Sequence, residues 1–334
     1  MNDVIMRLLK LTVRYPVAGG LRRREITALA PTNLEVRRGE LLAVVGESGS
    51  GKTTLGRAML RLIPVSGGHI SFDETEITEL GTGPLSKLRA RMQMVFQDPY
   101  SSLNPRKTVG KTLYEVLAHV GVAKSDRRAR AEELLEQVGL EAAAYDRRPS
   151  AFSGGQRQRV AIARALATNP DLVVADEPVS ALDVSVQAQV VNLLLDLKEQ
   201  HGLTMVFISH DLGVVSAIAD RIAVMYFGRV VEIGPANVIS HSPGHPYSQM
   251  LIENVPYPDV DQARAMVSAS SAAGAADLPS LLDPPTGCVF RNRCPRADAL
   301  CASTEPVLTE IGPERLAACH HPLTVSKGTK REIQ

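Results

Sequence analysis

Residues 46–53 read Gly-Glu-Ser-Gly-Ser-Gly-Lys-Thr, which fits the phosphate-loop pattern G-x-x-x-x-G-K-S/T. An apolar run at 41–45 precedes this segment and a helical pattern begins at Lys52, which is the context that the motif requires. Glycines let backbone N–H groups curl around phosphates, and the helix N-terminus adds partial positive charge. In this pattern Lys52 reaches the β- and γ-phosphates, and the hydroxyl of Thr53 can bind Mg²⁺. An ordinary glycine-rich turn is the alternative, and the Lys-Thr pair argues against it.

Two acids end the apolar run at residues 172–177, Leu-Val-Val-Ala-Asp-Glu. A buried strand in a parallel sheet brings its carboxyl end to the ligand crevice. We therefore predict that Asp176 holds Mg²⁺ through its water shell. Glu177 would orient or deprotonate an attacking water, a role that contributes roughly 10²–10⁴-fold in rate. A strand ending in a solvated acidic turn is the alternative, which the phosphate loop in the same chain disfavours.

A second turn suited to an anion occurs at Ser153-Gly154-Gly155-Gln156, ahead of a helix-like run at 157–167. Ser153 is a good N-cap, and the two glycines allow a ligand to approach the backbone closely. One nucleotide does not need two such helix N-termini from one chain. We therefore infer that this turn serves a nucleotide held by a facing chain, although taken alone it would be explained by a simple capped helix.

The elements that must position these residues alternate between strand and helix patterns. Strand patterns are followed by a region expected to be mostly helical at 85–145, and a hairpin with its turn at Phe227-Gly228 is expected over 221–233. The other expected strands lie at 7–15, 26–36, 41–45, 171–176 and 204–208, and the other expected helices begin at Lys52 or lie at 186–200 and 212–219. This alternation predicts an α/β domain with a parallel sheet.

Bulk composition limits the remaining possibilities. A chain of 334 residues with 44% apolar residues can form one large domain plus a smaller one, or two domains. A net charge of +1, no Trp and 4% aromatic residues disfavour a nucleic-acid partner. No apolar run approaches the about 18–20 residues that span a bilayer. The N-terminus lacks a signal pattern, so we expect a cytoplasmic chain that reaches the membrane through a partner.

Together these pieces resemble the ATP-binding cassette (ABC) family over about residues 5–250. The resemblance implies a P-loop NTPase fold with a RecA-like parallel sheet core, an antiparallel β subdomain and an α-helical subdomain. Phe152 to Gln156 resembles the signature motif, with Phe where Leu is commoner. Tyr15 resembles the aromatic residue that stacks on adenine, Gln97 resembles the Q-loop glutamine, and His210 resembles the switch histidine that contacts the γ-phosphate.

The resemblance implies ATP and Mg²⁺ as ligands and assigns a role to each matching residue. The nucleotide would be bound by Tyr15, Gly46, Ser48, Gly49, Gly51, Lys52, Thr53 and Thr54. Mg²⁺ would be held by Thr53, Gln97 and Asp176, and catalysis would involve Glu177, His210 and Gln97. The partner's ATP would be met by Ser153, Gly154, Gly155 and Gln156, and the D-loop at 180–183 would end in Asp183.

A closer resemblance is to the ATPases of oligopeptide/dipeptide importers, especially the second of the two that such systems carry. It rests on residues 96–105, 176–183 and 245–247. It implies an ATP-binding domain at 1–255 with a helical subdomain at about 98–168, a linker at 256–287 and a cysteine module at 288–334. The implied partners are two transmembrane permeases, a second ATP-binding subunit (a paralogue or a second copy) and an extracytoplasmic solute-binding protein. The implied location is peripheral, on the cytoplasmic face of the inner membrane.

All four cysteines lie near the C-terminus, at Cys288, Cys294, Cys301 and Cys319. In a cytosolic protein such a cluster indicates a metal site before disulfides. Paired C-x2-C knuckles, the usual zinc pattern, are absent. The importer family's Gly-Cys-x-Phe-x-x-Arg-Cys-Pro segment implies a 4Fe–4S cluster here, while zinc and four reduced structural thiols stay open. We expect a structural staple for a small module rather than a redox function.

The motifs disfavour other classes of ABC ATPase. Repair-type members carry a long coiled coil between the phosphate loop and the signature, but Lys52 and Ser153 are only about 100 residues apart. Ribosomal members carry two cassettes, and this chain has one set of motifs. An ATPase of iron–sulfur assembly would not explain the importer-like segments. The cargo stays open among peptides, nickel and glutathione-like solutes.

Overall fold

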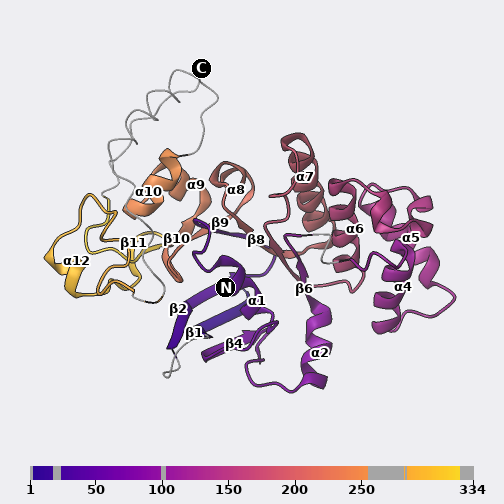
Figure 1. The fold of residues 1–334 in the computed structure, drawn as a ribbon, viewed down its shortest axis with the longest axis horizontal. Helices are drawn as coiled ribbons and strands as arrows, with labels where there is room; N and C mark the ends of the chain where they lie inside the picture. The colour runs from indigo at the N-terminus through magenta and orange to yellow at the C-terminus, as the bar shows by residue number, and fades with distance from the viewer. Residues whose placement is uncertain (1–2, 18–23, 99–102, 255–281, 283, 324–334) are drawn as a thin grey trace. The chain divides into compact units, whose positions relative to one another are not determined.

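The computed structural model describes residues 3–17, 24–98, 103–254, 282 and 284–323 (Figure 1). The chain divides into two compact units. The first comprises Met1–Leu11, Asn33–Leu42 and Leu55–Ser209, and the second comprises Thr12–Thr32, Ala43–Thr54 and His210–Gln334.

The secondary structure follows the predicted alternation closely. The strands are β1 (Val4–Val17), β2 (Arg24–Arg37), β3 (Leu41–Val45), β4 (Gly67–Phe72), β5 (Thr75–Glu76), β6 (Met92–Val95), β7 (Leu172–Asp176), β8 (Thr204–Ser209), β9 (Arg221–Tyr226), β10 (Arg229–Pro235), β11 (Thr309–Gly312) and β12 (Arg315–Ala317). The α-helices are α1 (Lys52–Met59), α2 (Thr82–Arg91), α4 (Val109–His119), α5 (Arg127–Gln137), α6 (Gly154–Leu166), α7 (Val184–His201), α8 (Leu212–Ile218), α9 (Ala236–His241), α10 (Pro246–Glu253) and α12 (Ala299–Ser303). Two 3₁₀ turns, η1 (Ala142–Asp146) and η2 (Pro149–Ala151), precede α6.

The first unit is built on parallel strands in the order β8-β7-β6. Every residue of β7 and β8 is buried. Strands covered on both faces read as continuous apolar runs, which is why the sequence reveals them. The parallel register places Asp176 beside Ile208 at the carboxyl ends of the two strands. The predicted parallel core is therefore present.

Strand β6 corrects the expectation that 85–145 is mostly helical. Its four residues pair in parallel with β7, from Met92 opposite Leu172 to Val95 opposite Ala175. A segment of four residues, Met92 to Val95, is too short to show a period of its own. Its strand conformation is set by pairing with a partner about 80 residues away.

A helical group in the first unit follows β6. Helices α4, α5 and α6 contact one another and lie together in Figure 1. Their apolar residues at spacings of three and four are buried, including Leu113, Leu117, Leu134 and Leu135. Amphipathic periodicity predicted these helices because it is the burial of this face that holds them in place.

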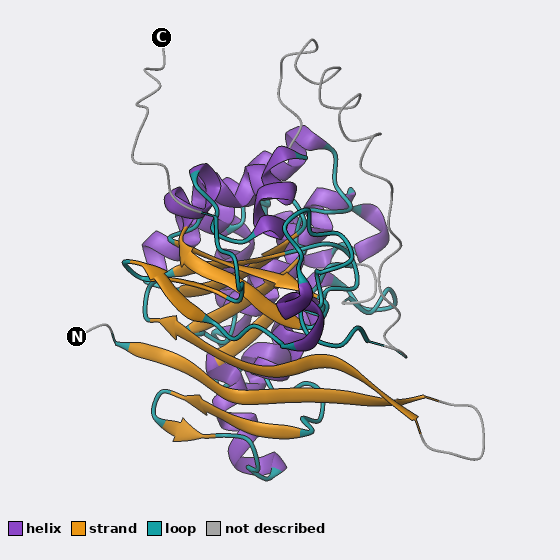
Figure 2. Ribbon diagram, turned by 90° about the vertical axis from the view of Figure 1, so that its left-hand side faces the viewer, coloured by secondary structure: helices purple, strands orange, loops and turns teal. Residues whose placement is uncertain are grey.

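A smaller sheet has the order β2-β1-β4-β5, with β4 and β5 antiparallel. Strands β1 and β2 each have 14 residues and run side by side as the long strands of Figure 2. The unit boundary falls within both strands. This sheet corresponds to the antiparallel β subdomain that the resemblance implies.

In the second unit the strand order is β11-β12-β10-β9-β3. The hairpin of β9 and β10 turns at Phe227 (φ 49°) and Gly228 (φ 75°), as predicted. Two successive residues with positive φ are typical of the hairpin turns that match strand twist. Strand β12 adds to β10, with Glu232 opposite Ala317. The cysteine region is thus joined to this sheet, which the sequence did not predict.

Two further expectations concern the membrane and the linker. Within the described residues, no helix is both long enough and apolar enough to cross a bilayer. The predicted linker at 256–287 lies almost wholly outside the described residues, as do residues 99–102 of the importer-like segment.

Candidate functional site

The phosphate loop of the second unit needs its glycines for steric reasons. A Cβ on Gly46 would lie 2.1 Å from the carbonyl oxygen of Met225, at the end of β9. A Cβ on Gly51, where φ is +99°, would lie 2.7 Å from the carbonyl oxygen of Ala28. Both distances are far below contact distance, so the loop can approach its neighbours only with glycine at these positions.

Lys52 is held across the loop by backbone carbonyls. Its side chain is buried, with 4% of the residue exposed. Its Nζ donates hydrogen bonds to the carbonyl oxygens of Gly46 at 2.7 Å and Glu47 at 2.9 Å. The backbone N–H of Gly228 donates to the carbonyl oxygen of Ser50 at 2.9 Å, so the β9–β10 hairpin supports the loop. Helix α1 begins at Lys52, and its N-terminal N–H groups therefore belong to the loop.

Two other predicted nucleotide contacts belong to the same unit. Tyr15 is half-buried on β1, and His210 is exposed directly after β8. Asp211 then caps α8 by accepting a hydrogen bond from the backbone N–H of Val214 at 3.2 Å. His210 therefore lies between the end of β8 and the capped start of α8.

The first unit brings Gln97 and Glu177 together. Asp176 ends β7 and is 1% exposed, while Glu177 follows it with a positive φ of 44°. The backbone N–H of Glu177 donates to the carbonyl oxygen of Ile208 at 3.0 Å. Nε2 of Gln97 donates to Oε2 of Glu177 at 3.1 Å. The left-handed backbone conformation costs a non-glycine residue about 1–3 kcal/mol. The surrounding structure must therefore hold Glu177 in this conformation.

Ser180 completes the contacts around this acidic turn. Its hydroxyl donates to the carbonyl oxygen of Glu177 at 3.1 Å, and Nε2 of Gln97 lies 3.4 Å from the same hydroxyl oxygen. The side chain of Gln97 is exposed, so its orientation depends on Glu177 and Ser180. Gln97 therefore contacts the carboxylate of Glu177, while Ser180 holds the backbone carbonyl of the same residue.

The signature turn of the first unit is a capping box at the start of α6. The hydroxyl of Ser153 accepts from the backbone N–H of Gln156 at 3.3 Å, and the side chain of Gln156 accepts from the backbone N–H of Ser153 at 3.1 Å. A Cβ on Gly155 would lie 2.4 Å from Cγ1 of Val186, on α7. Gly155 is thus needed for packing of α6 on α7, a reason that the sequence did not reveal.

Other members of this region face solvent. Ser153 and Asp183 are exposed, and Asp183 is the N-terminal flanking residue of α7. Val184, the first residue of α7, is 81% exposed. These residues are therefore accessible on the chain by itself.

The four cysteines of the second unit line one pocket, together with His245, Phe290 and other residues. All four are free thiols. Burial raises the pKa of Cys288, Cys294 and Cys319, for Cys319 to about 11, and each is raised further by nearby cysteine thiols. A metal reverses this preference because a coordinating thiol is deprotonated. Four cysteines that line one pocket therefore offer the type of donor that a thiolate-ligated metal centre uses.

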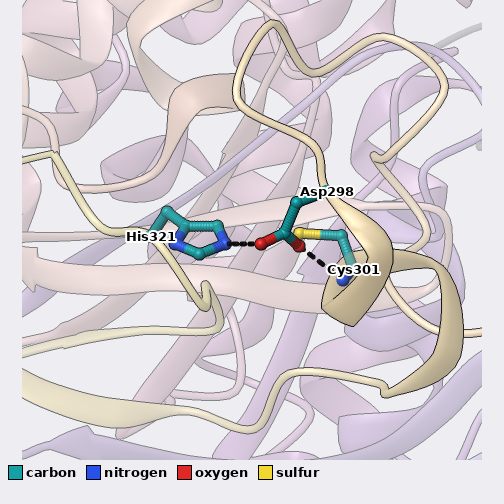
Figure 3. Close-up of side chains that lie close together, drawn as sticks. All are labelled: Asp298, Cys301 and His321. Atoms are coloured by element: carbon teal, nitrogen blue, oxygen red, sulfur yellow. Dashed lines mark hydrogen bonds and ion pairs between the residues drawn. The ribbon is translucent and has the colours of Figure 1, made fainter.

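Asp298 contacts both Cys301 and His321, as Figure 3 shows. Its Oδ1 accepts from the backbone N–H of Cys301 at 3.0 Å, and its Oδ2 lies 2.9 Å from Nε2 of His321. The Cys301 N–H lowers the pKa of the Asp298 carboxyl, and His321 adds to this effect. The carboxylate, the thiol and the imidazole come within 4.8 Å of one another. The contact holds Cys301 close to the segment that carries Cys319.

Sequence reasoning missed two residues that contact the phosphate loop. Tyr247 and Arg293 both bond to Glu47, the second residue of the loop. Both lie in segments with importer-like patterns, His-Pro-Tyr and Arg-Cys-Pro. Those patterns could have identified the residues, but their sequence positions give no indication of the contact.

Comparison with known families supports the predicted class. The model described as "ABC transporter" matches residues 29–180, and "Oligopeptide/dipeptide transporter, C-terminal region" matches residues 231–301. The chain is 49% identical to a putative peptide import ATP-binding protein of Brucella ovis, over 89% of this chain and 93% of that protein. It is 44% identical to the oligopeptide transport ATP-binding protein AppF of Bacillus subtilis, over 96% of this chain and 98% of that protein. It is 45% identical to the dipeptide transport ATP-binding protein DppF of Escherichia coli, over 96% of this chain and 95% of that protein.

Solved structures agree with this result. The ATP-binding cassette MJ0796, as a post-hydrolysis dimer bound to ADP and phosphate, has a TM-score of 0.63 and 33% identity, covering 70% of this chain and 99% of that one. CbiO1 of Clostridium perfringens has a TM-score of 0.63 and 29% identity, covering 72% and 92%. The predicted ABC ATPase fold is confirmed, and the DNA-repair, translation and iron–sulfur assembly classes are not favoured. The chain belongs to the ABC transporter ATP-binding proteins that carry an oligopeptide/dipeptide transporter C-terminal region, a family of ATPases.

Proposed function

We propose that this chain is the ATP-hydrolysing subunit that energises a peptide importer. The observation that carries the proposal is a complete phosphate loop, with Lys52 held at its carbonyls, in a chain whose relatives are named peptide import ATP-binding proteins. Those relatives match over nearly their whole length. The C-terminal region, which the importer family shares, points to the same class.

ATP binds through the phosphate loop in this proposal. Backbone N–H groups of the loop and of the first turn of α1 face the phosphates, and Lys52 exchanges a carbonyl partner for phosphate oxygens. Ser48, Gly49 and Thr54 complete the loop, while Tyr15 stacks on adenine. Mg²⁺ would be held by Thr53, Asp176 and Gln97, and would supply positive charge to the β- and γ-phosphate oxygens.

Hydrolysis depends on Glu177. Its carboxylate accepts the proton of a water whose oxygen bonds to the γ-phosphorus, while the bond from that phosphorus to ADP breaks. Gln97 orients the carboxylate through the observed Nε2 to Oε2 hydrogen bond. His210 would donate to the γ-phosphate as its negative charge is redistributed.

The working unit is proposed to be a pair of cassettes, formed with a paralogue or a second copy of this chain. Ser153, Gly154, Gly155 and Gln156 would meet the partner's ATP, with Asp183 beside them. The exposure of Ser153 and Asp183 supports this, as does the dimeric state of the MJ0796 structures. ATP would favour the closed pair because it contacts both chains only in that state.

The remaining parts of the assembly follow from the family. We propose an ATP-binding domain over 1–255 with its helical subdomain at about 98–168, a linker over 256–287 and a cysteine module over 288–334. Two transmembrane permeases would hold the pair at the cytoplasmic face of the inner membrane. A solute-binding protein would deliver the cargo from the other side.

The cysteine module is proposed to hold a 4Fe–4S cluster through Cys288, Cys294, Cys301 and Cys319. The convergence of the four thiols on one pocket supports this. The cluster would cross-link a small module that has little core of its own. Iron and acid-labile sulfide should copurify with anaerobically prepared protein, and zinc or metal-free protein would support the two alternatives instead.

Deletion of the gene and measurement of solute uptake test the transport function. Uptake of labelled di- and oligopeptides should fall and should return when the wild-type chain is supplied. The Lys52→Ala variant should not restore it. Unchanged peptide uptake with lost nickel or glutathione uptake would contradict the proposed cargo, and unchanged uptake of all three would contradict an importer.

A further inference from the structure

We propose that Arg293 of the cysteine module is a positioning residue for the phosphate loop. It fixes Glu47, and through Glu47 it fixes a carbonyl group that holds the ammonium of Lys52. The C-terminal region therefore contributes to nucleotide binding, although Arg293 lies outside the residues matched by the ABC transporter model. This inference rests on the proposed role of Lys52 in binding ATP.

The ion pair between Arg293 and Glu47 is bidentate. Nη1 of Arg293 lies 2.7 Å from Oε2 of Glu47, and Nη2 lies 2.8 Å from Oε1. The side chains are only 19% and 29% exposed, respectively. The hydrogen bonds that Arg293 donates to the Glu47 carboxylate raise the pKa of the guanidinium, which stays charged. A two-point pair of this kind fixes orientation as well as distance.

Glu47 is bonded at its backbone as well as its carboxylate. Its N–H donates to Oη of Tyr247 at 2.9 Å. Its carbonyl oxygen accepts from Nζ of Lys52 at 2.9 Å and from the N–H of Ser50 at 3.2 Å. Rotation of the Glu47 peptide would therefore move the acceptor that holds Lys52, and a carboxylate held by Arg293 restricts that rotation.

Arg293 is itself held in place by aromatic rings. Its guanidinium carbon lies 5.8 Å from the ring centroid of Tyr226 and 5.9 Å from that of Phe290. The rings of Tyr226 and Phe290 meet edge to face, with centroids 5.3 Å apart, and Tyr226 lies 4.6 Å from Tyr247. Arginine over aromatic faces is favourable, and the buried rings restrict the guanidinium to one orientation.

The backbone of Arg293 is set by the cysteine module. Its N–H donates to the carbonyl oxygen of Phe290 at 3.0 Å, and the next residue, Cys294, lines the cysteine pocket. Arg293 thus extends from the module's own turn to the phosphate loop. The module positions the arginine, and the arginine positions the loop.

The chain offers a matched control for a merely structural ion pair. Arg229 of β10 binds Glu305 of the cysteine module, with Nε 2.6 Å from Oε1 and Nη2 3.2 Å from Oε2. This pair also joins the module to the strands of the second unit, but neither residue belongs to the phosphate loop. Glu305→Ala therefore removes a comparable attachment while it leaves Glu47 untouched.

The test compares Arg293→Ala with Glu305→Ala in the full-length chain. ATP affinity is measured on the purified chain, and KM and kcat are measured in the assembled transporter. Arg293→Ala should raise the Kd and KM for ATP about tenfold with a less than about twofold change in kcat, since it removes uniform binding. Glu305→Ala should change neither. An equal loss of ATP affinity in the two variants would overturn the proposal, and so would unchanged ATP affinity in Arg293→Ala.

A double-mutant cycle identifies the route of action. Because Arg293 acts through Glu47, adding Arg293→Ala to Glu47→Ala should raise the Kd for ATP no further. Additive losses would contradict that route. If Arg293→Ala does not fold, Arg293→Lys can replace it, because lysine keeps the charge but cannot make the two-point contact with the carboxylate. This variant should show a Kd for ATP between those of wild type and Glu47→Ala. Wild-type affinity in Arg293→Lys would contradict a need for two-point contact.

Lys52→Ala separates this inference from the one on which it rests. If Lys52→Ala loses ATP affinity and Arg293→Ala does not, only the positioning role fails. If Lys52→Ala binds ATP as wild type does, the proposed nucleotide site fails as well.

Discussion

The side-chain amide of Gln97 donates from Nε2 to Oε2 of Glu177 over 3.1 Å. The two residues are 80 positions apart, at the ends of the neighbouring strands β6 and β7. Parallel strands bring their carboxyl ends to one edge, which is how two loops meet there. The contact joins the predicted water-activating carboxylate to the predicted Q-loop residue.

Gln97→Ala should lower kcat for ATP hydrolysis by roughly 10–100-fold, which is part of the roughly 10²–10⁴-fold that a positioned general base contributes, because the carboxylate of Glu177 loses the group that orients it. Steady-state phosphate release in the assembled transporter measures it. Gln93→Ala is the control: Gln93 lies on β6, ahead of Gln97 in the chain, and its Nε2 donates to the carbonyl oxygen of Arg89 instead. Wild-type kcat in Gln97→Ala would show that Glu177 needs no help from it.

Gly46→Ala should destabilise the chain more than Gly39→Ala does. Both glycines have positive φ, but a Cβ on Gly46 would clash with the Met225 carbonyl, whereas a Cβ on Gly39 would meet no atom within 4 Å. Backbone strain alone costs about 1 kcal/mol, and the clash should add at least about 2 kcal/mol. Urea unfolding compares the two free energies, and equal values would refute the steric argument.

Arg315→Ala should lower the free energy of unfolding by about 3–5 kcal/mol, because it leaves a buried carboxylate without its charge partner. The side chains of Arg315 and Glu232 are 2% and 0% exposed, and Nη2 of Arg315 lies 2.9 Å from Oε1 of Glu232. Glu232 also accepts from the N–H groups of Gly244 and His245.

The exposed pair of Arg7 and Glu35, with Nε 2.8 Å from Oε1, provides the comparison for this buried pair. Arg7→Ala should cost no more than about 1 kcal/mol, the usual value for a solvent-exposed ion pair. Thermal unfolding of the two variants under the same conditions distinguishes them. Similar losses would mean that burial does not control the strength of the Arg315 pair.

The stability contributed by Asp73 should depend on acid pH. Hydrogen bonds from Arg91 and then Arg38, each at 2.7 Å, hold the pKa of its carboxyl below the usual value of 3.8. The folded chain therefore binds fewer protons than the unfolded chain in this range. The contribution is complete above pH 3.8 and is lost as pH falls through the lowered pKa.

Asp73→Asn isolates this effect. The difference in unfolding free energy between wild type and variant should be largest near neutral pH and should shrink as pH falls below about 4. Asp171→Asn, at the other carboxylate that binds Arg91, serves as the comparison. A difference that stays constant with pH would contradict the assignment to Asp73.

Local patterns predicted the parts of the fold that local physics determines. The phosphate loop, β7 and the β9–β10 hairpin were predicted because glycines, continuous apolar runs and turn residues act within a few positions. Strand β6 was missed because its conformation depends on pairing with β7. The addition of β12 to β10 was missed for the same reason.

Long-range contacts at the site could not be predicted. Arg293 and Glu47 are 246 positions apart, and neither an Arg-Cys-Pro segment nor the second position of a phosphate loop specifies a partner. The glycines of the signature turn were predicted for ligand access, but the need for Gly155 against Val186 follows only from how α6 packs on α7. Residue types and their spacing predicted the candidate site residues. The long-range contacts that hold those residues in place could be seen only in the folded structure.

The most direct test of the account uses Glu177→Gln in the assembled transporter, with ATP binding and ATP turnover measured on the same preparation. The account predicts that ATP binds with near wild-type affinity while turnover is lost, because the amide cannot accept the proton of the attacking water. Turnover at the wild-type rate would contradict the central claim.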